Sequence, residues 1–134
     1  MTEFIWPVRV YYEDTDSGGV VYYANYLKFM ERARTEWLRS HGFEQDRLIA
    51  QDGIIFAVRH VDADFLRPAR FNDALEVSAS IANHGKVSMN FAQEVRLAES
   101  GQVLCRGEVK VACLHAERFR PHSIPKKILV ALTE

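Results

Sequence analysis

Polar and apolar residues alternate along most of this chain, which is the pattern of strands that bury one face. Near the start, Val8, Val10 and Tyr12 alternate around polar Arg9. Three later segments repeat this period of two, and a fourth is a longer apolar run that is partly β-branched. The predicted strands cover residues 5–12, 54–66, 75–81, 87–97 and 103–113.

A helical period interrupts the alternation between about residues 22 and 40. Apolar side chains recur there at i, i+3, i+4, i+7 and i+11, which predicts one buried helix face. This stripe consists of Tyr26, Phe29, Met30, Ala33 and Trp37. Gly42 follows the last turn as a helix terminator. A shorter helical segment is predicted over residues 44–51, ending at Gly53.

Gly, Asp, Asn and Ser cluster between these elements and predict turns at residues 14–19, 83–86 and 99–102. Residues 118–127 are basic and contain two prolines, so we expect a surface strand or tail there. A strand, one long helix and then four strands in a meander favour an α+β fold, an antiparallel sheet curled around the helix. Without a repeat or linker, residues 1–134 are expected to form a single domain.

Composition narrows the function classes. Seventeen Lys and Arg residues against 18 Asp and Glu residues leave a net charge of −1, which produces no general attraction for nucleic acid. No apolar run approaches the roughly 20 residues of a membrane span, and no signal peptide pattern precedes residue 20, so a cytoplasmic location is expected. Cys105 and Cys113 are eight residues apart on one predicted strand, where they cannot bridge. No metal-ligand spacing is present among the scattered histidines.

The turn before the long helix contains the residues best suited to chemistry. Asp16 lies two residues before the Gly18-Gly19 pair, and an aromatic helix start follows. A helix N-terminus has unpaired N–H groups and a partial positive charge, which can stabilise an oxyanion and keep Asp16 ionised as base or nucleophile. The glycines let a substrate approach the backbone closely. The same residue types are also typical of a turn and helix cap, so that interpretation stays open.

One pattern carries a family resemblance: Tyr12-x-Asp14-x-Asp16-x-x-Gly19-x-Val21-x-Tyr23-x-x-Tyr26, followed by Glu31-Arg32-Ala33-Arg34. It resembles the 4-hydroxybenzoyl-CoA thioesterase family of hotdog-fold enzymes, and within that family the YbgC-type acyl-CoA thioesterases of the Tol-Pal system. The similarity covers nearly the whole chain, including residues 5–12 and 65–73.

The resemblance implies a hotdog fold, dimers that pair their sheets edge to edge, and commonly homotetramers. It implies hydrolysis of acyl-CoA thioesters without a metal or organic cofactor. The family's catalytic carboxylate is the second aspartate of the Asp-x-Asp pair, here Asp16, and the backbone N–H at Tyr23 polarises the thioester carbonyl. Many YbgC-type members have His at that position, so a role that needs an imidazole does not transfer to Tyr23.

The remaining candidates concern substrate binding. Gly19 lies where the substrate approaches the backbone, and Tyr22 is a candidate for the acyl pocket. Lys86 and Ser88 fall where related enzymes contact the nucleotide part of CoA, although a lysine in a hairpin is equally typical of a solvated surface.

Two further carboxylates have alternative interpretations. Asp14 is expected to bond the turn backbone rather than to act as a second acid or base. Glu31 is a helix glutamate of the kind that is catalytic in some hotdog thioesterases. An ion pair with Arg34, or a contact with Thr35, is the simpler interpretation of Glu31.

The predicted function is hydrolysis of an acyl-CoA or of a related thioester on acyl carrier protein. One alternative is a hotdog dehydratase, which would need a catalytic His, and residues 16–31 contain none. The other is a non-catalytic module that binds acyl carrier protein. Thiol release from acyl-CoAs distinguishes these three.

Overall fold

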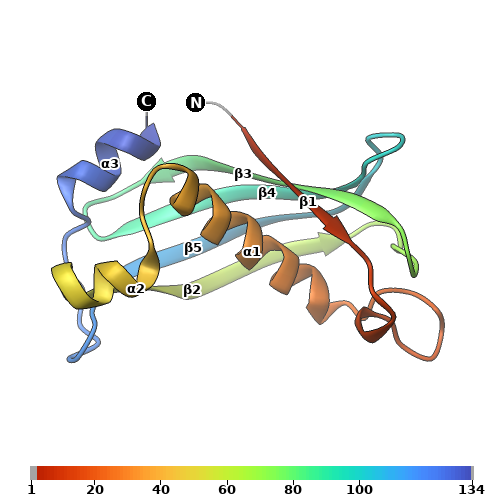
Figure 1. Ribbon diagram of the computed structural model, residues 1–134, viewed down its shortest axis with the longest axis horizontal. Helices are drawn as coiled ribbons and strands as arrows, with labels where there is room; N and C mark the ends of the chain where they lie inside the picture. The colour runs from red at the N-terminus through yellow and green to blue at the C-terminus, as the bar shows by residue number, and fades with distance from the viewer. Residues whose placement is uncertain (1–2, 134) are drawn as a thin grey trace.

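A computed structural model describes residues 3–133 and contains one antiparallel sheet curved around a long helix (Figure 1). The strand order is β1-β3-β4-β5-β2. This arrangement is the predicted hotdog fold, an α+β architecture. The elements are β1 (Phe4–Arg9), α1 (Ala24–Ser40), α2 (Gln45–Arg47), β2 (Ile54–Phe65), β3 (Ala74–His84), β4 (Ser88–Leu97), β5 (Val103–His115) and α3 (Lys126–Thr133).

The pairing of β2 corrects the predicted four-strand meander. Strands β3, β4 and β5 follow one another through hairpins, but β2 pairs with β5, from Ile54 opposite His115 to Phe65 opposite Cys105. The connection 66–73 therefore crosses from the β2 edge of the sheet to the β1–β3 edge. Backbone hydrogen bonds fix both of its ends, because Leu66 N–H donates to Leu104 and Asn72 N–H donates to Val10.

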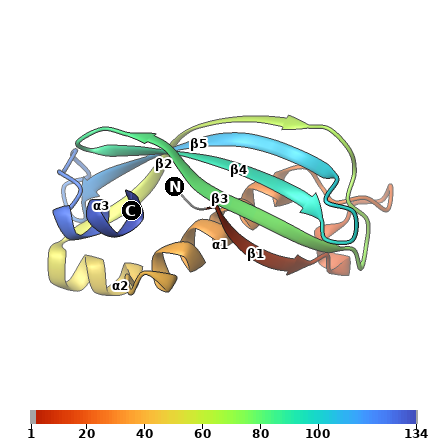
Figure 2. The same cartoon turned by 90° about the horizontal axis from the view of Figure 1, so that it is seen from above.

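Helix α1 lies along one face of the sheet (Figure 2) and buries the predicted apolar stripe there. The Trp37 ring meets Phe91 of β4 edge to face, with 5.4 Å between ring centroids. The helix ends where expected, since Gly42 has a φ of +88°, a conformation that suits glycine. The predicted segment 44–51 is confirmed in outline as α2 and a π-helical turn, Leu48–Asp52, that ends at Gly53.

The C-terminal segment differs from the predicted strand or tail. It forms a single bridge, Leu114 with Pro121, and then continues as α3. Proline is tolerated at a helix start, and Pro125 precedes α3, where its carbonyl accepts a hydrogen bond from Ile128 N–H. Ile128 and Leu132 lie on one helix face and are buried, so α3 covers apolar side chains at one end of the sheet.

Two smaller expectations are also resolved. The first strand ends at Arg9 rather than at residue 12, because residues Tyr12–Asp14 form a 3₁₀ turn.

Cys105 and Cys113 are both buried free thiols, and burial raises the pKa of each to about 11. Among the described helices, none is long and apolar enough to cross a membrane.

Candidate active site

The loop between β1 and α1 forms a small hairpin with an exposed tip. Thr15 pairs with Val21 as an antiparallel bridge, and Asp16 N–H donates to Val20 over 2.9 Å. At the tip, Gly19 N–H donates back to the Asp16 carbonyl over 3.0 Å, and Gly19 has a φ of +81°. A side chain would be strained at that φ, so glycine is what allows the tight return of the chain.

The Asp16 carboxylate is oriented by this hairpin. Its Oδ1 accepts a hydrogen bond from Gly18 N–H over 2.8 Å. A Cβ atom at position 18 would lie 3.2 Å from that oxygen, so glycine leaves it room. Within residues 3–133, the second oxygen, Oδ2, accepts no hydrogen bond and forms no ion pair. The exposed carboxylate therefore has one fixed oxygen and one that is free to react.

Asp14 holds the hairpin against the start of α1. Its Oδ2 accepts a hydrogen bond from Tyr11 N–H over 2.8 Å, which confirms the interpretation as a backbone-bonding turn residue. Its carbonyl accepts from Tyr22 N–H and from Asn25 Nδ2, each over 2.9 Å. Asn25 is buried, and sequence reasoning missed it because an asparagine in the first turn of a helix is common. Asp14 and Asn25 thus join the base of the hairpin that contains Asp16 to the first turn of α1.

At the N-terminus of α1, two backbone N–H groups have no hydrogen-bond acceptor among the described residues. Tyr23 directly precedes the helix with φ −55° and ψ −33°, so its N–H points along the helix axis as those of α1 do. Asn25 N–H donates to the Tyr22 carbonyl, whereas the N–H groups of Tyr23 and Ala24 donate to no acceptor within the described part of the chain. Unpaired N–H groups and the helix dipole together favour negative charge at this position.

Aromatic side chains surround the helix start. The ring centroids of Tyr22 and Tyr23 are 4.9 Å apart, and Tyr23 meets Phe65 at the end of β2 over 5.7 Å. Behind them, Tyr26 is buried, and its hydroxyl accepts a hydrogen bond from Ala69 N–H over 2.9 Å. Tyr26 is therefore a core residue, while Tyr22, Tyr23 and Phe65 form an exposed aromatic wall at the start of α1.

Lys86 and Ser88 lie at the other end of the sheet. Lys86 lies in the β3–β4 turn (Figure 1), where its carbonyl accepts a hydrogen bond from Ile124 N–H ahead of α3, and Ser88 is the first residue of β4. The first residue of β3, Ala74, pairs with Arg9 near the Asp16 hairpin, and β3 then extends for 11 residues. At about 3.3 Å per residue, this separates the two groups by roughly 30 Å within one chain. A single substrate molecule that contacts both Asp16 and Lys86 would therefore have to lie between two copies of the chain.

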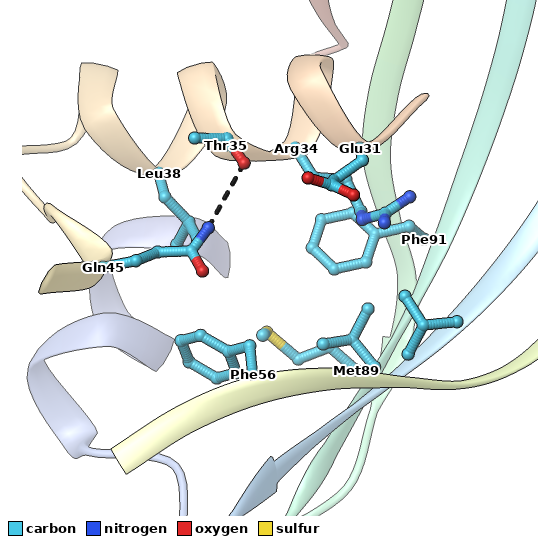
Figure 3. Close-up of a pocket in the computed structure, with 10 residues that line it drawn as sticks. Glu31, Arg34, Thr35, Leu38, Gln45, Phe56, Met89 and Phe91 are labelled. Atoms are coloured by element: carbon cyan, nitrogen blue, oxygen red, sulfur yellow. Dashed lines mark hydrogen bonds between the residues drawn. The ribbon is translucent and has the colours of Figure 1, made fainter. Parts of the chain in front are cut away.

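Glu31 lies one residue beyond two helical turns from Tyr23 and faces a cavity (Figure 3). The expected ion pair with Arg34 does not form within the described residues. Instead Arg34 donates to Gln93 Oε1 over 2.9 Å, and Thr35 accepts a hydrogen bond from Gln45. Burial lowers the pKa of Arg34, and the nearby Glu31 carboxylate opposes that shift.

Comparison with known proteins identifies relatives of this chain. The sequence profile of the thioesterase superfamily matches residues 18–104. The chain is 45% identical over 128 residues to the acyl-CoA thioester hydrolase YbgC of Escherichia coli O157:H7, covering 96% of this chain and 94% of that protein. It is 41% identical to the acyl-CoA thioesterase YbgC of Haemophilus influenzae, covering 96% and 93%.

A solved structure agrees with the fold. The 1,4-dihydroxy-2-naphthoyl-CoA thioesterase of Synechocystis superposes with a TM-score of 0.92 at 26% identity, covering 99% of this chain and 97% of that one. The matched profile begins at Gly18, two residues after Asp16, and ends at Leu104, the second residue of β5, so it includes Tyr23 and the whole of α1.

Proposed function

Because this chain belongs to the thioesterase superfamily, we propose that it is an acyl-CoA thioester hydrolase in which Asp16 acts on the thioester carbonyl. The observation that supports this site is the junction between hairpin and helix. A carboxylate with a free oxygen lies on one side of it, and the unpaired Tyr23 N–H lies on the other. Acyl transfer needs these two elements, a nucleophile or base and an oxyanion donor.

Two routes use this geometry. In the first, Asp16 Oδ2 attacks the carbonyl carbon, the oxyanion accepts a hydrogen bond from Tyr23 N–H, and collapse expels the CoA thiolate. Water then hydrolyses the acyl-Asp16 anhydride and releases the carboxylic acid. In the second, Asp16 removes a proton from water, the water oxygen attacks the carbonyl carbon, and collapse of the tetrahedral intermediate expels the CoA thiolate. Both routes give the same products, and neither needs a metal or organic cofactor.

The substrate approaches over glycine and aromatic residues in this proposal. Apart from Gly19 and its two chain neighbours, no atom of residues 3–133 lies within 4 Å of the position that a Cβ would take at Gly19, so the backbone there is open to a ligand. Tyr22 forms part of the aromatic wall and is proposed to contact the acyl group next to the carbonyl.

A homo-oligomer, a dimer or a homotetramer, is proposed for the working enzyme. The outer edge of β2 has no strand partner within the described residues, and Val58, Val61 and Phe65 are exposed along that strand. Pairing of two such edges would remove an aggregation-prone surface. It would also let Lys86 and Ser88 of one copy approach the CoA nucleotide bound to another.

The resemblance to YbgC-type enzymes supports three broader proposals. The first is that acyl carrier protein also carries acyl groups that the enzyme hydrolyses. The second is that the protein is cytoplasmic and associated with the Tol-Pal system, and the third is that residues 1–134 form one functional domain. None of them depends on the chemistry at Asp16.

Release of free CoA thiol from a panel of acyl-CoAs, with EDTA present, tests the proposed function. We expect thiol release that EDTA does not reduce. A product that retains its thioester and gains a double bond would identify a dehydratase instead. Acyl-CoA binding without thiol release would identify a binding module.

A further inference from the structure

The Tyr26 hydroxyl is a buried polar group in the first turn of α1 that takes no part in the proposed chemistry. Tyr26 is 3% exposed, and its oxygen accepts a hydrogen bond from Ala69 N–H over 2.9 Å. Burial raises the pKa of Tyr26, so the hydroxyl stays neutral at neutral pH. Because an unbonded hydroxyl is costly to bury, this hydrogen bond helps to hold the connection 66–73 against the helix.

Ala69 lies between α1 and the hairpin that contains Asp16. Its N–H donates to Tyr26, and its carbonyl accepts a hydrogen bond from Val21 N–H over 2.9 Å. Ala69 is fully buried, so solvent does not supply an alternative partner for either group. One buried residue thus joins the helix to the hairpin through its two backbone groups.

Two further contacts extend this link to the backbone of Asp16. Arg70, the residue after Ala69, pairs with Val20 as an antiparallel bridge. The Val20 carbonyl in turn accepts a hydrogen bond from Asp16 N–H over 2.9 Å. A displacement of Ala69 would therefore move Val20 and Val21, and with them the backbone that carries the Asp16 carboxylate.

The base of the hairpin has a separate attachment to the helix. Asn25 Nδ2 and Tyr22 N–H both donate to the Asp14 carbonyl, each over 2.9 Å. The link from Tyr26 through Ala69 holds the hairpin closer to its tip. With a single point of attachment the hairpin could pivot on the helix, whereas two points fix its orientation.

We propose that the Tyr26 hydroxyl is a positioning group for the hydrolase reaction, which fixes the orientation of the Asp16 carboxylate relative to the Tyr23 N–H. This proposal rests on the proposed function and adds a residue to it. The reaction needs the carboxylate and the oxyanion donor on the same carbonyl, and a misplacement of about 1 Å can cost about 10²-fold in rate. Since the hydroxyl is buried away from the substrate, its loss should act on kcat rather than on binding.

Tyr26→Phe tests this role, because it removes the hydroxyl and keeps the ring that packs against Phe29 and Phe65. The Ala69 N–H then loses its acceptor in the core, and the connection 66–73 is expected to shift. In the thiol-release assay, kcat should fall at least about tenfold. By calorimetry, the dissociation constant of free CoA should change by less than about twofold. A kcat within about twofold of the wild type would overturn the proposal.

Ser78→Ala is the matched control, since it also removes the acceptor of a backbone N–H in the core. The Ser78 hydroxyl accepts a hydrogen bond from Glu94 N–H over 2.8 Å, and Ser78 is 1% exposed. It lies in the middle of β3 and takes no part in the bonds that join Ala69 to the hairpin. Both variants should lower the melting temperature, but only Tyr26→Phe should lower kcat. A matching loss of kcat in Ser78→Ala would reduce the Tyr26 effect to general destabilisation and contradict the proposal.

Amide hydrogen exchange tests the link without relying on turnover. Relative to the amides at the centre of β5, the N–H groups of Ala69, Val21 and Asp16 should exchange at least about tenfold faster in Tyr26→Phe than in the wild type or in Ser78→Ala. Unchanged exchange in Tyr26→Phe would exclude the link even if kcat fell.

The same experiments separate this proposal from the proposed function. If the wild type releases thiol and Tyr26→Phe releases it equally fast, only the positioning role is refuted. If the wild type releases no thiol from any acyl-CoA, the proposed function is refuted and the positioning role with it.

Discussion

Replacement of Asp16 by asparagine separates chemistry from structure at the hairpin. The Gly18 N–H donates to Oδ1 over 2.8 Å, and an amide oxygen can accept the same hydrogen bond. That bond would orient the asparagine so that its NH₂ group replaces Oδ2, the oxygen free to react. The variant therefore keeps the shape of the loop and loses both the negative charge and the basic oxygen.

The expected loss of activity is large compared with the loss of stability. General-base catalysis contributes about 10²- to 10⁴-fold, and removal of a nucleophile can cost more. We expect kcat to fall at least about 100-fold, or about 2.7 kcal/mol in the activation free energy. Since Asp16 is exposed and its hydrogen bond is retained, the free energy of unfolding should change by less than about 1 kcal/mol.

The matched control is Asp14→Asn, the same change two residues earlier. Asp14 bonds Tyr11 N–H, so its replacement should act on stability, by up to about 1 kcal/mol, and should leave kcat within about fivefold. Thiol release and thermal melts of both variants give the result. Near-normal kcat in Asp16→Asn with a loss in Asp14→Asn would identify the other carboxylate. If both retain activity, Glu31 becomes the leading candidate.

Three further predictions follow from other parts of the molecule. Light scattering at micromolar concentration should give a multiple of the 15.4 kDa chain mass, because the outer edge of β2 pairs with no other described strand, and a monomer would contradict the proposed assembly. Gln93→Leu should lower the free energy of unfolding in urea by about 3 kcal/mol, since buried Gln93 bonds Arg34 and the Met30 and Ser78 carbonyls; a loss below about 1 kcal/mol would refute this. Burial raises the pKa of Glu94, but hydrogen bonds from Arg106 and Arg96 outweigh it and leave the pKa below its usual value. A lowered folded pKa contributes stability that is fully present above the unfolded pKa and is lost as the pH falls through the folded pKa. Glu94→Gln should therefore lower the melting temperature at pH 7, and this difference should shrink as the pH falls through the lowered pKa of Glu94.

Local patterns were sufficient to predict most elements of the fold. The strands and α1 follow from periods of 2 and 3.6, because each element buries one face and the buried residues recur with the geometry of the backbone. Two features of the fold could not be predicted from local patterns, for physical reasons. The pairing of β2 with β5 depends on the crossing segment 66–73, which contains no periodic signal. Helix α3 is short, and the prolines before it are equally typical of a tail, so only its burial against the rest of the molecule decides its conformation.

At the candidate site, the sequence indicated which residues to consider, but not the groups with which they form hydrogen bonds. Asp16 and Gly19 stand out because they belong to the motif that carries the family resemblance, although the same residue types are also typical of a turn. The clamp formed by the Asp14 carbonyl, Tyr22 N–H and Asn25 was not predictable, because a backbone carbonyl has no signal in a sequence. The cavity between α1 and β2 is a similar case, since the side chains that line it come from three strands and two helices whose arrangement is set by the fold.

The distance between Lys86 and Asp16 follows from strand direction. In an antiparallel sheet, successive turns alternate between its two ends, so the β3–β4 turn lies one full strand away from the connection that precedes β3. That connection bonds the Asp16 hairpin through the bridge between Val20 and Arg70. Lys86 and Asp16 can therefore act on one acyl-CoA only if two copies supply them. The proposed nucleotide contact and the proposed oligomer are thus one hypothesis, because loss of the oligomer would remove the Lys86 contact while Asp16 and Tyr23 N–H remained together within each chain.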